Sequence, residues 1–243
     1  MRRRAAVAVV LAVAAVATLA AGRAAWAADE CRGLQTCLPV TGPWVAITAV
    51  PRGEASTAVW ELRCPLRGYI VAGVDARVSD RAIDVSIRGE NGAPVSPGVT
   101  TGRAVVFTAL YAGGAPRPTS FQPFIGCIPT SGGGGRGETA VRRPAAFTPV
   151  KALDRRVVRK RLVSGATVKV VGGCPAGTRL LGTSHAYAFR TEAEPGFTLL
   201  RAVTVRRVVT GRRVVATATL APAVPQSVPV ELQLHSLCSR GTR

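Results

Sequence analysis

Two stretches of this chain repeat the same landmarks in the same order. The first copy opens with Cys64-Pro65-Leu66-Arg67-Gly68 and reaches Gly73 five residues later; the second opens with Cys174-Pro175-Ala176-Gly177 and reaches Gly182 after the same interval. A repeat of this length indicates two copies of one structural unit, and it limits the possible folds more than composition does.

Each copy continues with a related nine-residue segment and closes with a cysteine. The segments are TGRAVVFTA at 101–109 and TGRRVVATA at 210–218, and the closing cysteines are Cys127 and Cys238. Between the two copies, the opening cysteines are 110 residues apart, the Thr-Gly-Arg segments 109 and the closing cysteines 111. Codon bias in an alanine- and arginine-rich chain could produce one such match, but not three in order.

The repeat selects one disulfide pattern among the 15 that six cysteines allow. Two pairs lie within the copies and one lies in front of them: Cys64–Cys127, Cys174–Cys238 and Cys31–Cys37. Each of the two bridges within the copies closes a long loop. Closing a loop of that length stabilises a domain by roughly 4 kcal/mol in the chain-entropy description. Zinc at the N-terminal pair is disfavoured, because it needs two more ligands and both histidines, His185 and His235, lie in the second copy.

Alternating apolar and polar residues predict short β-strands in both copies. Ala58, Trp60 and Leu62 show this period in the first copy, and residues 228–234 show it before Cys238. Numerous prolines argue against long helices. We therefore expect an all-β protein with two tandem, homologous small β-sandwich modules of immunoglobulin-like type, each closed by a disulfide that joins its two sheets.

The Thr-Gly-Arg segments at 101–103 and 210–212 lie between β-rich runs. This position predicts a hairpin turn in each copy, with Gly102 and Gly211 at positive φ.

The N-terminus has the three parts of a secretory signal peptide. Residues 2–4 are arginines, 5–21 are apolar, and Ala25-Trp26-Ala27 is a cleavage site of A-x-A type. We expect residues 1–27 to be removed and the mature chain to be secreted, outside the cell or in its envelope. The alternative is an uncleaved anchor, but the apolar run has only 17 residues and no later segment is long enough to span a bilayer.

The remaining chain divides at a glycine-rich stretch, residues 132–135. We expect the first module at 28–130, a glycine-rich and basic linker at 131–150, and the second module at 151–243. The second module would open with a strand near Val157 and Val158.

The pattern Cys-Pro, glycine, a second glycine and a closing cysteine on an alternating strand resembles modules of many uncharacterised secreted proteins from GC-rich bacteria. In those modules the second glycine is usually part of a Gly-Gly run, whereas here it is Gly73-Val74 and Gly182-Thr183. The resemblance implies an extracellular β-module, and it implies neither catalytic residues nor a substrate.

Positive charge is concentrated in the second copy. Residues 28–140 have 10 basic and 9 acidic side chains, whereas 141–243 have 18 and 4. This excess predicts a polyanion-binding surface on two segments: Arg206, Arg207, Arg212, Arg213, Arg155, Arg156, Arg159, Lys160 and Arg161. The partner would be an anionic cell-wall polymer, lipid headgroups or an acidic polysaccharide. Nucleic acid is disfavoured, because aromatic residues for base stacking are sparse. A solvated arginine surface that reflects codon usage is the alternative.

No catalytic constellation is visible, so we expect a non-enzymatic protein without cofactor or metal. Asp75, Asp80 and His185 leave one alternative, a secreted hydrolase with its site between the modules. No G-x-S-x-G elbow accompanies them, and the aspartate spacing fits no EF-hand loop. We expect His235 to be exposed on the last strand.

Overall fold

A computed structural model describes residues 31, 36–48, 56–90, 102–113, 117–130 and 153–240. The expected signal peptide (1–27) and linker (131–150) lie outside the described residues. We call residues 36–130 the first half and residues 153–240 the second half. The described chain is all-β with one short helix, as the alternating pattern predicts.

The strands of the two halves are as follows. The first half contains β1 (Leu38–Thr41), β2 (Trp44–Ile47), β3 (Ser56–Arg63), β4 (Tyr69–Val78), β5 (Ile83–Gly89), β6 (Ala104–Tyr111) and β7 (Thr119–Pro129). The second half contains β8 (Leu153–Leu162), β9 (Thr167–Gly173), β10 (Thr178–Phe189), helix α2 (Phe197–Leu200), β11 (Val203–Thr210), β12 (Arg213–Leu220) and β13 (Val230–Arg240).

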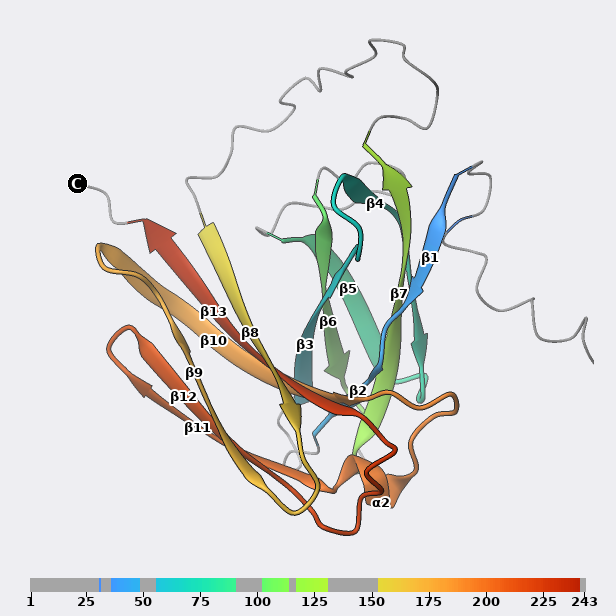
Figure 1. Cartoon of the computed structure of the whole chain (residues 1–243), viewed down its shortest axis with the longest axis vertical. Coiled ribbons are helices and arrows are strands. Elements are labelled where there is room, and N and C mark those ends of the chain that lie inside the picture. Colours follow the sequence, from blue (N-terminus) through green and yellow to red (C-terminus); the bar gives the residue numbers. More distant parts are fainter. Residues whose placement is uncertain are drawn as a thin grey trace, which may run out of the picture.

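One seven-stranded antiparallel sheet runs through both halves (Figure 1). Its strands from β7 onward run β7-β2-β10-β13-β8. Strands β1 and β2 pair with successive parts of one edge of β7, and β4 pairs with the other edge. The halves join where β2 pairs with β10, through Trp44–Phe189 and Val45–Ala188. We call this the central sheet.

Each half adds a three-stranded sheet, and the two small sheets have corresponding orders. They are β3-β6-β5 in the first half and β9-β12-β11 in the second. The repeated glycines also occupy corresponding places. Gly68 and Gly177 have φ values of 79° and 77°, and bulges precede Gly73 in β4 and Gly182 in β10.

The two small sheets cover opposite faces of the central sheet. Successive residues of a strand point to opposite faces. Ala186 and Ala188 of β10 lie in the core of the first half, whereas Tyr187 and Phe189 lie in the core of the second. Where the halves meet, the central sheet is therefore packed against β3-β6-β5 on one face and against β9-β12-β11 on the other.

The disulfides are Cys31–Cys37, Cys64–Cys127 and Cys174–Cys238, which confirms the predicted pairing. Cys64 and Cys174 directly follow β3 and β9 of the small sheets, and their partners lie in β7 and β13 of the central sheet. Each long-range disulfide therefore joins two sheets, as expected.

The hairpin prediction is confirmed in the second half and wrong in the first. Gly211 has a φ of 57° in the tight turn between β11 and β12. In the first half β5 ends at Gly89 and β6 begins at Ala104. Gly102 lies directly before β6 rather than at the tip of a tight turn, and its φ is not positive.

The expected exposure of His235 is also wrong, since this side chain is 1% exposed. Alternation along β13 gives two faces but does not show what covers each. The face with His235 is covered by β3 of the first half, where Gln233 bonds the backbone of Glu61.

Candidate functional site

A cavity of about 430 Å³ opens where β8 and β10 end and β13 begins. Seven residues line it, of which four are basic and one is acidic: Arg159, Lys160, Arg161, Arg190, Glu231, Pro229 and Val230. We call this the cationic pocket.

Backbone pairing brings these residues together. Arg161 and Arg159 of β8 lie opposite Glu231 and Gln233 of β13. The Arg190 N–H donates to the Pro229 carbonyl at 3.0 Å, which holds the end of β10 beside the start of β13. Strand β8 is the last strand of the central sheet, and Arg159, Lys160 and Arg161 near its end are exposed.

Two cations of the pocket are available to a ligand. Arg161 and Arg190 are exposed, and neither has a carboxylate within ion-pair distance among the described residues. Lys160 is exposed as well, but it alternates with Arg159 and Arg161 along β8, so its side chain points to the other face of the central sheet. In a site of this kind a charge-assisted hydrogen bond to phosphate, sulfate or carboxylate is the favoured contact.

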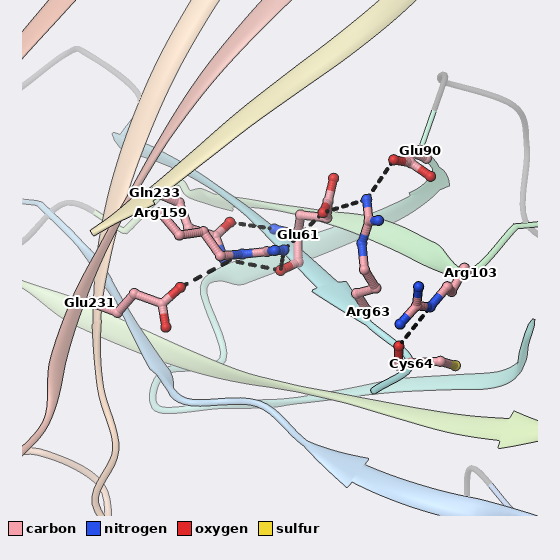
Figure 2. Close-up of polar contacts among 8 residues, drawn as sticks. All are labelled: Glu61, Arg63, Cys64, Glu90, Arg103, Arg159, Glu231 and Gln233. Atoms are coloured by element: carbon pink, nitrogen blue, oxygen red, sulfur yellow. Dashed lines mark hydrogen bonds and ion pairs between the residues drawn. The ribbon is translucent and has the colours of Figure 1, made fainter. Parts of the chain in front are cut away.

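Arg159 is held differently, by a carboxylate of the other half (Figure 2). Its Nη2 donates to Glu61 Oε1 at 2.8 Å, and its Nε lies 3.7 Å from Glu231. The Glu61 side chain is 1% exposed, so its charge is compensated mainly by guanidinium groups. Arg159 therefore forms a fixed wall of the pocket rather than a free cation.

Further contacts surround Glu61 and join the halves. Arg63 Nη2 donates to Glu61 at 3.2 Å and to Glu90 at 2.7 Å. The Gln233 amide brackets the backbone of Glu61: its Oε1 accepts from the N–H at 2.9 Å and its Nε2 donates to the carbonyl at 3.1 Å. We call these contacts the Glu61 cluster. They provide hydrogen-bond partners for the Glu61 backbone at the unpaired edge of β3, and they connect β3 to β8 and β13.

Two histidines near the cations are kept neutral. Burial, and to a smaller extent the positive charges of Arg155 and Arg159, lowers the pKa of His235 to about 3. Burial and then Arg207 lower the pKa of His185 to about 4. Neither ring therefore adds positive charge at neutral pH.

The structure divides the predicted β8 segment between the two faces of the central sheet. Alternation in the β8–β13 register places Arg155, Arg159 and Arg161 on one face and Arg156 and Lys160 on the other. Arg156 pairs with Asp154 at 3.1 Å. Of these five predicted residues, three line the cationic pocket: Arg159, Lys160 and Arg161.

The predicted hairpin residues also differ in their surroundings. Arg206 and Arg213 are exposed, whereas Arg207 lies 3.5 Å from His185. Arg212 donates to the Pro175 carbonyl at 3.2 Å, as Arg103 does to the Cys64 and Pro65 carbonyls in the first half. The arginine of each Thr-Gly-Arg segment thus holds the turn that follows the opening cysteine.

Arg190, Glu61 and Gln233 were not predicted from the sequence as parts of a site. Arg190 is a single arginine before an acidic turn, and only the pairing of β10 with β13 brings it to the pocket. Glu61 occupies a polar position of an alternating strand, a pattern typical of exposed residues.

Asp75, Asp80 and His185 have different partners. Asp75 accepts from the Ala76 N–H, and Asp80 pairs with Arg117 at 2.5 Å. Hydrogen bonds from Ala82 and Arg117 lower the pKa of Asp80. Strands β7 and β2 separate β4 from β10, so these residues do not form one site.

Within the part of the chain that the structure describes, no group of three or more histidine, cysteine or acidic residues could hold a metal ion. The described helix is too short to cross a membrane. No protein-family model matches the chain, and no curated protein matches it.

Proposed function

We propose that this protein is an extracellular, non-enzymatic binding protein, built from two homologous immunoglobulin-like modules, that binds polyanions through its second half. The observation that carries the proposal is the cationic pocket, in which Arg161 and Arg190 are exposed beside the fixed guanidinium of Arg159.

The disulfides and the corresponding strand orders support the extracellular two-module part of the proposal. Three disulfides are typical of an oxidising compartment. The small sheets β3-β6-β5 and β9-β12-β11 have the same order, and each is joined to the central sheet by one disulfide. The resemblance to secreted bacterial modules points in the same direction.

Charge balance supports polyanions over other ligands. The second half has 14 basic and 4 acidic residues, and the described residues of the first half have 7 and 5. A patch of one sign attracts a polymer of the opposite sign and raises its association rate. Cell-wall polymers with repeating phosphates and acidic polysaccharides fit this chemistry.

The experiment measures binding of the purified protein to immobilised polyphosphate and polygalacturonate, with neutral dextran as reference. The double variant R161S/R190S removes two unpaired charges from the pocket, whereas R67S/R88S removes two exposed charges from the first half. We expect the pocket variant to bind about tenfold or more weakly, at about 1 kcal/mol or more per contact, and the control to bind like the wild type.

Two results would contradict the proposal. Equal binding by the two variants would show that net charge alone matters. An absence of binding at low salt would leave the arginines as a solvated surface that reflects codon usage.

A further inference from the structure

The outer face of the small sheet β9-β12-β11 carries an exposed apolar row. Val214, Ala216 and Ala218 of β12 are buried in the core, so Val215, Thr217 and Thr219 point outward. In the register of this sheet, Val171 and Val208 flank Val215 on the neighbouring strands. Val171 and Val208 are 43% and 49% exposed.

Cations border this valine row on both sides. The next row on one side contains Lys169, Thr217 and Arg206, and the row on the other side contains Arg213. All three cations are exposed, and none is in an ion pair among the described residues. The three strands contain no acidic residue. The face is therefore apolar at its centre and uniformly positive around it.

The first half has no such apolar row at the corresponding positions, although its three strands pair in the corresponding order. Aligning Cys64 with Cys174 and the two Thr-Gly-Arg segments gives Glu61, Val106 and Arg88 as the corresponding row of β3, β6 and β5. That row has a charge at each end, and Glu61 is buried by the second half. The uncovered valines and their bordering cations are thus particular to the second half.

We propose that the outer face of β9, β12 and β11 docks on an anionic lipid bilayer. Shallow insertion of apolar side chains together with attraction of Lys and Arg to anionic headgroups is the combination that holds proteins at a membrane surface. A soluble polyanion would use the cations but not the valines. The row also contains no aromatic ring, the side chain on which the flat face of a sugar would pack.

This surface is separate from the cationic pocket. The pocket lies where β8 ends and β13 begins, whereas the valine row lies near the end of β9, where β12 and β10 begin. The proposal does not depend on the pocket, and variants can distinguish the two sites.

The test is co-sedimentation of the purified protein with phosphatidylcholine vesicles, with and without phosphatidylglycerol. The variant V171T/V208T keeps β-branched side chains of nearly the same shape at exposed positions. The variant K169S/R206S removes two of the bordering cations, and R161S/R190S serves as the pocket control. Circular dichroism checks that each variant is folded.

We expect the wild type to bind only the anionic vesicles. Binding should fall about tenfold in V171T/V208T and in K169S/R206S, and R161S/R190S should bind like the wild type. Unchanged binding by V171T/V208T, or no binding of wild type to anionic vesicles, would overturn the membrane proposal and leave the pocket untouched. Loss of polyphosphate binding in V171T/V208T, with vesicle binding unchanged, would assign the face to a soluble polymer instead.

Discussion

The two halves of this protein share an architecture and differ in the surfaces they present. Each half joins its small sheet to the central sheet through one disulfide, and an arginine after a glycine holds the turn at the opening cysteine in both. In the first half Glu61, Glu90 and Asp80 all pair with arginines. The second half has an excess of cations, so corresponding strand orders carry surfaces of different charge in the two halves.

The comparison also shows how the halves depend on each other. Strand β2 pairs with β10, and Glu61 of the first half is enclosed by Arg159 and Gln233 of the second. The halves therefore share the central sheet and a buried polar cluster. We expect them to unfold together rather than as two independent domains.

Removing a long-range disulfide should have the largest effect. C174A/C238A and C64A/C127A should each lower the free energy of unfolding by about 4 kcal/mol, because each bridge closes a loop of similar length. Urea unfolding followed by tryptophan fluorescence and by circular dichroism measures this. A single transition is expected in both variants, and two separate transitions would show that the halves fold independently.

Breaking the bracket around Glu61 should have the next largest effect. Gln233→Leu leaves the Glu61 N–H buried without a partner and leaves its carbonyl only the long hydrogen bond from Arg159 Nη2 at 3.4 Å, which costs about 2 to 3 kcal/mol. Gln226→Leu changes an exposed glutamine in the same way and should be neutral. Equal stability of the two variants would contradict the role of Gln233 in joining the halves.

Acid should destabilise the protein through its buried histidines. The pKa of His235 is about 3 in the folded state, below the ordinary value of about 6.5. The unfolded chain therefore binds the proton more readily, and stability is lost as pH falls from about 6.5 toward 3, by about 2 kcal/mol at pH 5 from His235 alone. His235→Gln should flatten this part of the stability profile. The same pH dependence in the variant would exclude His235 as its source.

We expect the smallest losses of stability from replacing the two turn arginines, Arg103 and Arg212. Arg103 donates to two carbonyls and Arg212 to one. Arg103→Ser should cost about 1 kcal/mol and Arg212→Ser about half of that, because both side chains are partly or fully solvated. Thermal unfolding of the two variants measures the difference, and a larger loss for Arg212→Ser would contradict the assignment.

The sequence predicted local structure and disulfides better than contacts between the halves. The repeat predicted Cys64–Cys127 and Cys174–Cys238, and alternation predicted strands such as β3 and β13. Neither pattern shows which edge or face another segment will cover. Glu61 and His235 were therefore not recognised as buried, because contacts of β3 with β8 and β13 across the halves cover them.

The pocket was partly predictable for the same reason. Arg159, Lys160 and Arg161 are adjacent in the sequence and were expected to contribute to a binding surface. Arg190 comes to them through the pairing of β10 with β13, which depends on residues far apart in the chain. The pairing of Arg159 with Glu61 across the halves required the folded structure.

The salt dependence of polyphosphate binding tests the central claim most directly. Affinity should fall steeply as the Debye length shortens from about 10 Å at 0.1 M to about 3 Å at 1 M salt. Because R161S/R190S removes two contacting charges, a plot of log affinity against log salt should be less steep for it by about two than for the wild type, as counterion release predicts. The control R67S/R88S should keep the wild-type slope. Identical slopes for all three proteins would contradict binding at the cationic pocket.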